Sequence, residues 1–78
     1  MNKIRIRKCF RYEVGDLVYV IGESKKRWFY DVPEHTPIEI VKVDFTFTNP
    51  NNMSYYLYNP IFKHKMWVFN KDIVGKVL

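Results

Sequence analysis

The sequence predicts an all-β fold, a single small barrel of about five strands. Three observations predict it. Apolar side chains alternate with polar ones in several short segments, which is the spacing of strands. Gly, Pro and Asn separate these segments, and none of them has the spacing of an amphipathic helix. A chain of 78 residues with 47% hydrophobic content is enough for one ordered domain and is not a disordered tail.

The chain begins with a basic segment. Residues 1–11 contain five cations and no acid, and isoleucines alternate with the charges. We expect a basic lead-in strand or arm here, followed by a barrel domain over residues 12–78. The first strand of that domain is expected over residues 16–21. Val18 and Val20 share one face, and the other face is also apolar, so we expect cover on both sides for part of its length.

Residues 22–37 are expected to form a long first loop. They contain Gly, Ser and Pro and no sustained period, and they include a basic and aromatic run from Lys25 to Tyr30. A connection of this length in a small domain is usually functional or disordered. The three consecutive rings in the run argue against disorder.

The longest strand signal covers residues 38–48. Ile38 and Ile40 alternate with polar residues in one phase, and the apolar residues from Val43 onward alternate in the other. This change of phase predicts a bulge or a sharp strand bend at residues 40–41, of the kind that a small barrel needs to close.

The second half of the chain predicts a hairpin and a closing strand. The run Asn-Pro-Asn-Asn at residues 49–52 is a strong turn signal, and it predicts a hairpin to a strand over residues 54–58. A strand is expected over residues 65–69. Residues 70–73 suit a single 3₁₀ turn, and residues 74–78 a short final strand.

These segments resemble the SH3-like barrel proteins encoded by phages and other mobile elements of Gram-positive bacteria. The resemblance covers residues 12–78 and lies in the opening Val-Gly-Asp-x-Val from Val14, the aromatic strand that follows the central hairpin, and the Trp67-x-Phe69 strand with its short turn. It implies an SH3-like barrel with a long first loop and a 3₁₀ turn before the last strand. It also implies a phage-type accessory protein that binds and modulates a host or phage protein in the bacterial cytoplasm. The Gly-Asp-x-Val element is similar, too, to the opening of ribosomal and transcription-factor barrels that bind RNA.

The chain lacks the residue patterns of most catalytic sites. Cys9 could act as a nucleophile only with His35 or His64, and no supporting motif surrounds it. One Cys and two His are too few for a structural zinc site of Cys and His ligands, and no phosphate-binding glycine loop is present. We therefore expect no enzyme activity, no metal and no cofactor. The absence of a long apolar run or a signal-peptide core predicts a soluble cytoplasmic protein without a membrane partner, and a lone thiol fits a reducing compartment.

Protein binding is the favoured function. Strand alternation places Tyr56 and Tyr58 opposite their apolar neighbours, so one of the two faces must be partly exposed. Trp, Tyr and Arg are enriched in interface hot spots. The acidic pair with which eukaryotic SH3 domains hold basic proline ligands is not evident, and the first loop is basic instead, which favours a partner with an acidic surface. The expected contact residues are Lys25, Lys26, Arg27, Trp28 and Tyr30, with Tyr56, Tyr58, Lys65 and Trp67 as neighbours, while Phe29 suits contact or core equally.

The alternative is a barrel that binds RNA or single-stranded DNA. The formal net charge is +5, and the cations are concentrated near the start of the chain, in the first loop and near the end. Lys and Arg would hold phosphates while exposed rings stack on unpaired bases. Pairing at a barrel edge is a further option. Residues 1–11 or the last strand could pair with another chain, either making a homodimer or adding a strand to the sheet of a partner.

Overall fold

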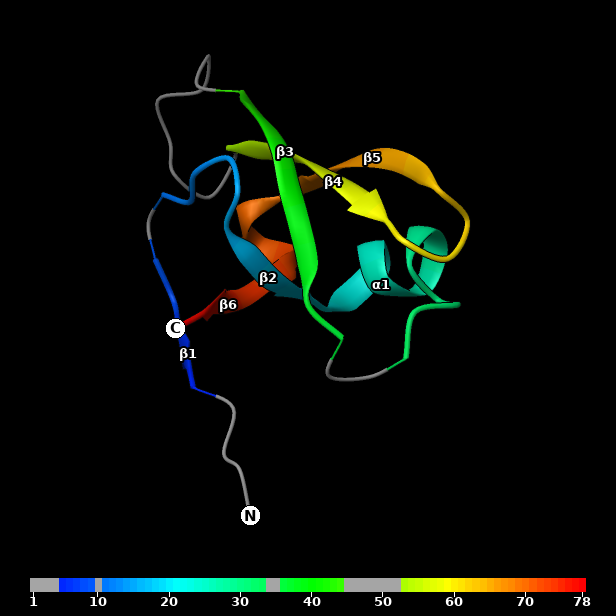
Figure 1. Ribbon diagram of the computed structural model, residues 1–78, viewed down its shortest axis with the longest axis horizontal. Helices are drawn as coiled ribbons and strands as arrows, with labels where there is room; N and C mark the ends of the chain where they lie inside the picture. Colours follow the sequence, from blue (N-terminus) through cyan, green and yellow to red (C-terminus); the bar gives the residue numbers. More distant parts are fainter. Residues whose placement is uncertain (1–4, 10, 34–35, 45–52) are drawn as a thin grey trace.

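The computed structural model describes residues 5–9, 11–33, 36–44 and 53–78. They form one six-stranded antiparallel sheet with the strand order β1-β6-β2-β3-β4-β5, so the all-β prediction is confirmed with one strand more than expected (Figure 1). The elements are β1 Ile6–Arg7, β2 Leu17–Val20, α1 Gly22–Trp28, β3 Ile38–Asp44, β4 Ser54–Asn59, β5 His64–Phe69, the 3₁₀ turn η2 Asn70–Asp72, and β6 Ile73–Val77.

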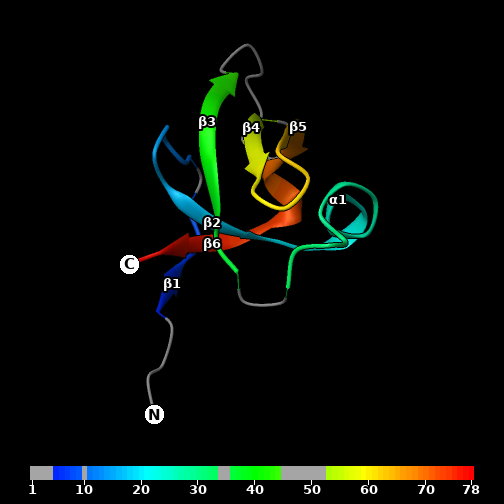
Figure 2. The same cartoon turned by 45° about the vertical axis from the view of Figure 1, so that its right-hand side comes forward.

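The sheet bends over on itself but stays open. In Figure 2, β2 and β6 run across the direction of β3, β4 and β5. The strand order nevertheless ends at β1 and at β5, and within the described residues these two strands do not pair. The pairing therefore stops short of the closed barrel that the sequence predicts.

The core lies inside this bend. Its largest fully buried side chains are Tyr12, Tyr55 and Phe29, and the rings of Tyr12 and Tyr55 meet edge to face with centroids 5.5 Å apart. On β2, Val18 and Val20 are buried as predicted. On its other face Tyr19 is half-buried, whereas the neighbouring Leu17 and Ile21 are exposed, so the expected second cover is limited to the middle of the strand.

The predicted bulge in the central strand is confirmed. The register of β3 against β4 shifts between Ile40 and Lys42, which lets Ile40 and then Val43 face the core. The expected turn at residues 49–52, and the part of the predicted strand beyond Asp44, lie outside the described residues. The strand predicted over residues 65–69, the 3₁₀ turn and the final strand are confirmed as β5, η2 and β6.

The expectation of a loop over residues 22–37 is wrong at its start, where α1 forms a short helix. Seven residues make two turns, too few to display a helical period in the sequence, and helices this short depend on tertiary contacts. Asp72 of η2 supplies two of them: its carbonyl accepts from the Ile21 N–H at 2.7 Å, and its carboxylate accepts from Ser24 Oγ at 2.7 Å. No helix among the described residues is long and apolar enough to cross a membrane.

The basic lead-in is a strand for part of its length. Ile6 and Arg7 pair with Val77 and Lys76 of β6, and the Lys8 ammonium donates to the carbonyl of Ile73 at 3.2 Å. These contacts fix the lead-in at the edge of the sheet next to β6. The described part of residues 1–11 is therefore an edge strand rather than a free arm.

Candidate functional site

Three strands present one face away from the core. The register of β3, β4 and β5 aligns Lys42 with Tyr56 and Trp67 in one row. The next row aligns Tyr58 with Lys65. Because side chains alternate along each strand, these residues lie opposite the buried Tyr55, Leu57 and Val68. We call this surface the outer aromatic face; it comprises Lys42, Tyr56, Tyr58, Lys65, Trp67 and Phe69.

A ring stack forms the centre of the outer aromatic face. Tyr56 and Trp67 have ring centroids 4.8 Å apart and planes inclined by 29°. Trp67 remains 42% exposed and Phe69 45%, although rings of this size are usually buried. The stack fixes the two rings relative to each other before any partner arrives. A rigid aromatic surface of this kind is available for contact at little cost in side-chain entropy.

Charges of both signs border these rings. Lys42 and Lys65 are exposed cations on the outer aromatic face. On β3, Glu39 lies beside Tyr58 of β4, and Asp44 at the end of β3 lies beside Ser54 of β4. The rings of this face are therefore bordered by polar groups of both signs, as in the polar rim of a protein interface.

A second group of rings lies where the end of α1 meets the β4–β5 turn. Phe62 contacts Tyr30 with centroids 5.7 Å apart and His64 with centroids 6.0 Å apart, and His64 in turn lies against the buried Phe29 at 6.5 Å. Tyr30 is 64% exposed and Phe62 52%. We call Phe29, Tyr30, Phe62 and His64 the turn cluster.

Asn59 holds the turn cluster together. Its buried side-chain amide donates to the carbonyl of Trp28 and to Asp31 Oδ1, both at 3.0 Å. Its Oδ1 accepts from the N–H groups of Ile61 at 2.9 Å and Phe62 at 3.2 Å. One side chain thus ties the end of α1 to the β4–β5 turn, which lie side by side in Figure 1.

The structure divides the residues that the sequence predicts for binding. Tyr56, Tyr58, Lys65 and Trp67 lie together on the outer aromatic face. Tyr30 belongs to the turn cluster, and Trp28 precedes that cluster at the end of α1, 40% exposed. Phe29 is fully buried, which decides its two readings in favour of the core.

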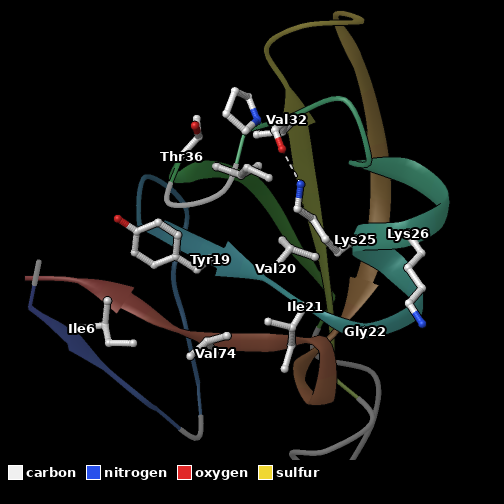
Figure 3. A pocket seen from close by; sticks show the side chains of 12 residues that line it. Ile6, Tyr19, Val20, Ile21, Gly22, Lys25, Lys26, Val32, Thr36 and Val74 are labelled. Carbon is white, nitrogen blue, oxygen red and sulfur yellow. Dashed lines mark hydrogen bonds between the residues drawn. The ribbon is translucent and has the colours of Figure 1, made fainter.

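The three basic residues of α1 differ in their contacts. The Lys25 ammonium donates to the carbonyls of Phe29 and Val32 and so closes the end of the helix. Arg27 lies 3.7 Å from Glu23 in an exposed pair one turn away. Lys25 and Lys26 both line an apolar cavity of ≈ 540 Å³, in which Figure 3 shows Ile6, Tyr19 and Val74 on one side and Val32 and Thr36 on the other.

Sequence reasoning missed three residues of these surfaces. Phe69 and Lys42 lie on the outer aromatic face, and Phe62 in the turn cluster. Alternation from Trp67 signals Phe69, because residues two apart on a strand share a face. Lys42 had no such signal, since the bulge changes the phase of β3. The described residues contain no group of His, Cys, Asp and Glu that could hold a metal ion.

Comparison of the chain with known protein families, with curated proteins and with solved structures finds no match.

Proposed function

We propose that this protein is a non-enzymatic binding module that contacts a partner protein through the outer aromatic face. The observation that carries the proposal is the stack of the half-buried Tyr56 on the exposed Trp67, with Phe69 exposed on the same face. Rigid Trp and Tyr side chains dominate the binding energy of protein interfaces. Exposed rings flanked by charges also form the apolar centre and polar rim that such interfaces share.

The order of the elements supports a finer proposal, that the fold is SH3-like. After β1, the chain runs through β2, a long connection, β3, β4, β5, the 3₁₀ turn and β6, which is the order implied by the resemblance to phage and mobile-element proteins. In that setting the partner is a host or phage protein whose activity the module modulates.

Partner capture tests the proposal. The tagged full-length chain is incubated with nuclease-treated bacterial lysate beside the variants Trp67→Ala and Ile61→Ala. Ile61 is an exposed apolar residue of the β4–β5 turn and serves as a matched control, since it lies off the outer aromatic face. We expect a stoichiometric protein that is captured by the parent chain and by Ile61→Ala, with at least about tenfold less on Trp67→Ala.

Two outcomes contradict the proposal. Loss of every partner after nuclease treatment assigns nucleic-acid binding instead. Equal capture by all three chains places the interface away from Trp67. Folding of each variant is checked by circular dichroism, so that lost capture is not mistaken for lost structure.

A further inference from the structure

β5 forms one edge of the sheet that the described residues build. It is the last strand in their order and pairs with β4 alone. At six residues it is three times as long as β1, the two-residue strand at the opposite end. Figure 2 shows β5 outermost in the row of β3, β4 and β5. A long edge strand of this kind is a template for pairing with another chain.

Alternate residues of β5 direct their backbone groups to this edge. The Asn70 N–H donates to the Met53 carbonyl at 3.0 Å, and the register continues without a shift to Asn59 and His64. In an antiparallel pair every second residue exchanges hydrogen bonds with its partner. Counting back from Asn70, the backbone N–H and C=O groups of residues 68, 66 and 64 therefore face β4. The backbone N–H and C=O groups of Lys65, Trp67 and Phe69 point away from β4, toward the edge of the sheet.

The same three residues place their side chains on the outer aromatic face. Lys65, Trp67 and Phe69 are all exposed. One segment thus offers backbone donors and acceptors that no described strand pairs with, together with a row of side chains beside them. Recognition by strand addition uses this combination, with affinity from the ladder and specificity from alternate side chains.

We propose that β5 binds an extended acidic segment of the partner protein as an additional strand. This rests on the proposed protein-binding function and specifies how the partner docks. Residues 63–71 carry Lys63, Lys65 and Lys71 and no acid, whereas Glu39 and Asp44 lie two strands away on β3. An incoming strand with Asp or Glu near Lys65 and an apolar residue near Trp67 complements this edge.

The charges favour an acidic partner over a second copy of the chain. Pairing of two β5 edges would bring these three lysines of both molecules to one seam, where like charges repel. β1 is the poorer site for a strand, because it has two residues whereas β5 has six. A short edge strand offers few backbone groups for pairing, and short length is a common protection of sheet edges.

Hydrogen exchange with a defined probe tests strand addition. The isotope-labelled full-length chain is titrated with a capped peptide of alternating Glu and Val, and amide exchange is followed by nuclear magnetic resonance. At about 1 mM peptide we expect exchange of the Lys65, Trp67 and Phe69 amides to slow by at least about tenfold. The analogous peptide of Lys and Val should leave these amides unchanged.

A proline variant separates the backbone contribution from the side chain. Lys65→Pro removes an outward N–H and leaves the pairing with β4 intact, as proline permits at an edge. We expect it to weaken peptide binding by at least about tenfold, and the control Lys65→Ala, which removes the charge alone, by about threefold.

Each other outcome overturns the proposal. Unprotected amides at these three positions exclude strand addition, and equal protection by the Lys and Val peptide excludes an acidic segment. Slow exchange that depends on protein concentration without peptide identifies a second copy as the occupant. The two proposals fail separately. Capture that depends on Trp67 but survives Lys65→Pro supports the protein-binding function and contradicts strand addition. Peptide protection without any captured protein supports strand addition at β5 and contradicts the proposed protein partner.

Discussion

At the scale of single residues, Asn59 stands out because its buried side chain takes part in four hydrogen bonds. Replacement by alanine would leave the Trp28 carbonyl, Asp31 Oδ1 and two turn N–H groups without this partner. A buried polar group that loses its hydrogen-bond partner destabilises the fold by about 1–3 kcal/mol, and the total loss is smaller where water can replace the partner. We expect Asn59→Ala to lower the free energy of unfolding by about 2–4 kcal/mol, measured by urea denaturation.

A second pair of variants tests this assignment. Asn59→Asp keeps the acceptor for the turn N–H groups but sets a carboxylate against that of Asp31, so it should also destabilise. Adding Asp31→Asn restores a donor and an acceptor between the two positions, and part of the lost stability should return. A change below about 0.5 kcal/mol for Asn59→Ala would show that the turn cluster holds without this side chain.

Tyr12 predicts how stability responds to alkaline pH. Burial raises the pKa of the Tyr12 phenol above its ordinary value of 10.0, and the hydrogen bond from the Cys9 N–H opposes this shift without cancelling it. The unfolded chain therefore ionises Tyr12 at lower pH than the folded chain does. The higher pKa of Tyr12 in the folded state contributes to the free energy of unfolding. This contribution is fully present below about pH 10 and is lost as the pH rises through the folded-state pKa.

The variant Tyr12→Phe isolates this effect from the other tyrosines. Near pH 8 we expect it to be less stable than the parent by about 1 kcal/mol, because the Cys9 N–H loses its acceptor. Above about pH 10 the difference should shrink, since phenylalanine cannot ionise. The free energies of unfolding of both chains, measured between about pH 8 and pH 11, give the answer. A constant difference would mean that Tyr12 ionises alike in both states.

At the scale of elements, the position of α1 depends on its first residue. Gly22 has φ of +70°, and a Cβ there would lie 2.8 Å from Asp72 Oδ1, within the carboxylate that Ser24 holds. Any side chain at this position would require an unfavourable left-handed backbone conformation and would also clash with the Asp72 carboxylate. We expect Gly22→Ala to destabilise the protein by about 2–3 kcal/mol in urea denaturation.

Gly15 provides the matched control for that change. It also has positive φ, at +95°, but a Cβ there would meet nothing within 4 Å. Gly15→Ala should therefore cost the backbone strain alone, about 1–2 kcal/mol, and less than Gly22→Ala. Equal losses would show that Asp72 moves aside, and that its contacts do not hold α1 in place.

The elements also show how far the sequence could be interpreted. Strand alternation predicted β2, β4 and β5, and the change of phase predicted the bulge in β3, because both are local patterns. α1 left no such pattern, since its stability comes from Asp72, about 50 residues further along the chain. The aromatic contact residues could be proposed from the sequence one by one, from residue type and strand alternation. Their division between the outer aromatic face and the turn cluster depends on strand register and on Asn59, which no local pattern encodes.

At the scale of the whole molecule, the distribution of the positive charge distinguishes a nucleic-acid target from a protein target. The net charge is +5. Described cations lie at both ends of the sheet: Arg5 and Arg7 near β1, and Lys63 and Lys65 near β5. A surface that tracks a nucleic-acid backbone needs its cations along one path. Here Arg5 and Arg7 are separated from Lys63 and Lys65 by the inner strands of the sheet. A target that meets only the cations near β5, such as a local acidic segment of a polypeptide, fits this distribution.

Salt dependence distinguishes the two kinds of target. Binding of single-stranded nucleic acid through about five phosphates would give a slope of log K against log salt of about −3.5. For the captured protein partner we expect a slope no steeper than about −2, because the rings contribute without salt dependence and few cations take part. Affinities measured by biolayer interferometry between about 50 and 500 mM KCl give this slope. Replacing Arg5 and Arg7 by glutamine should leave it unchanged, since they lie at the opposite edge from β5. A slope that falls by about one for each of these arginines would place them in the interface and return nucleic acid as the target.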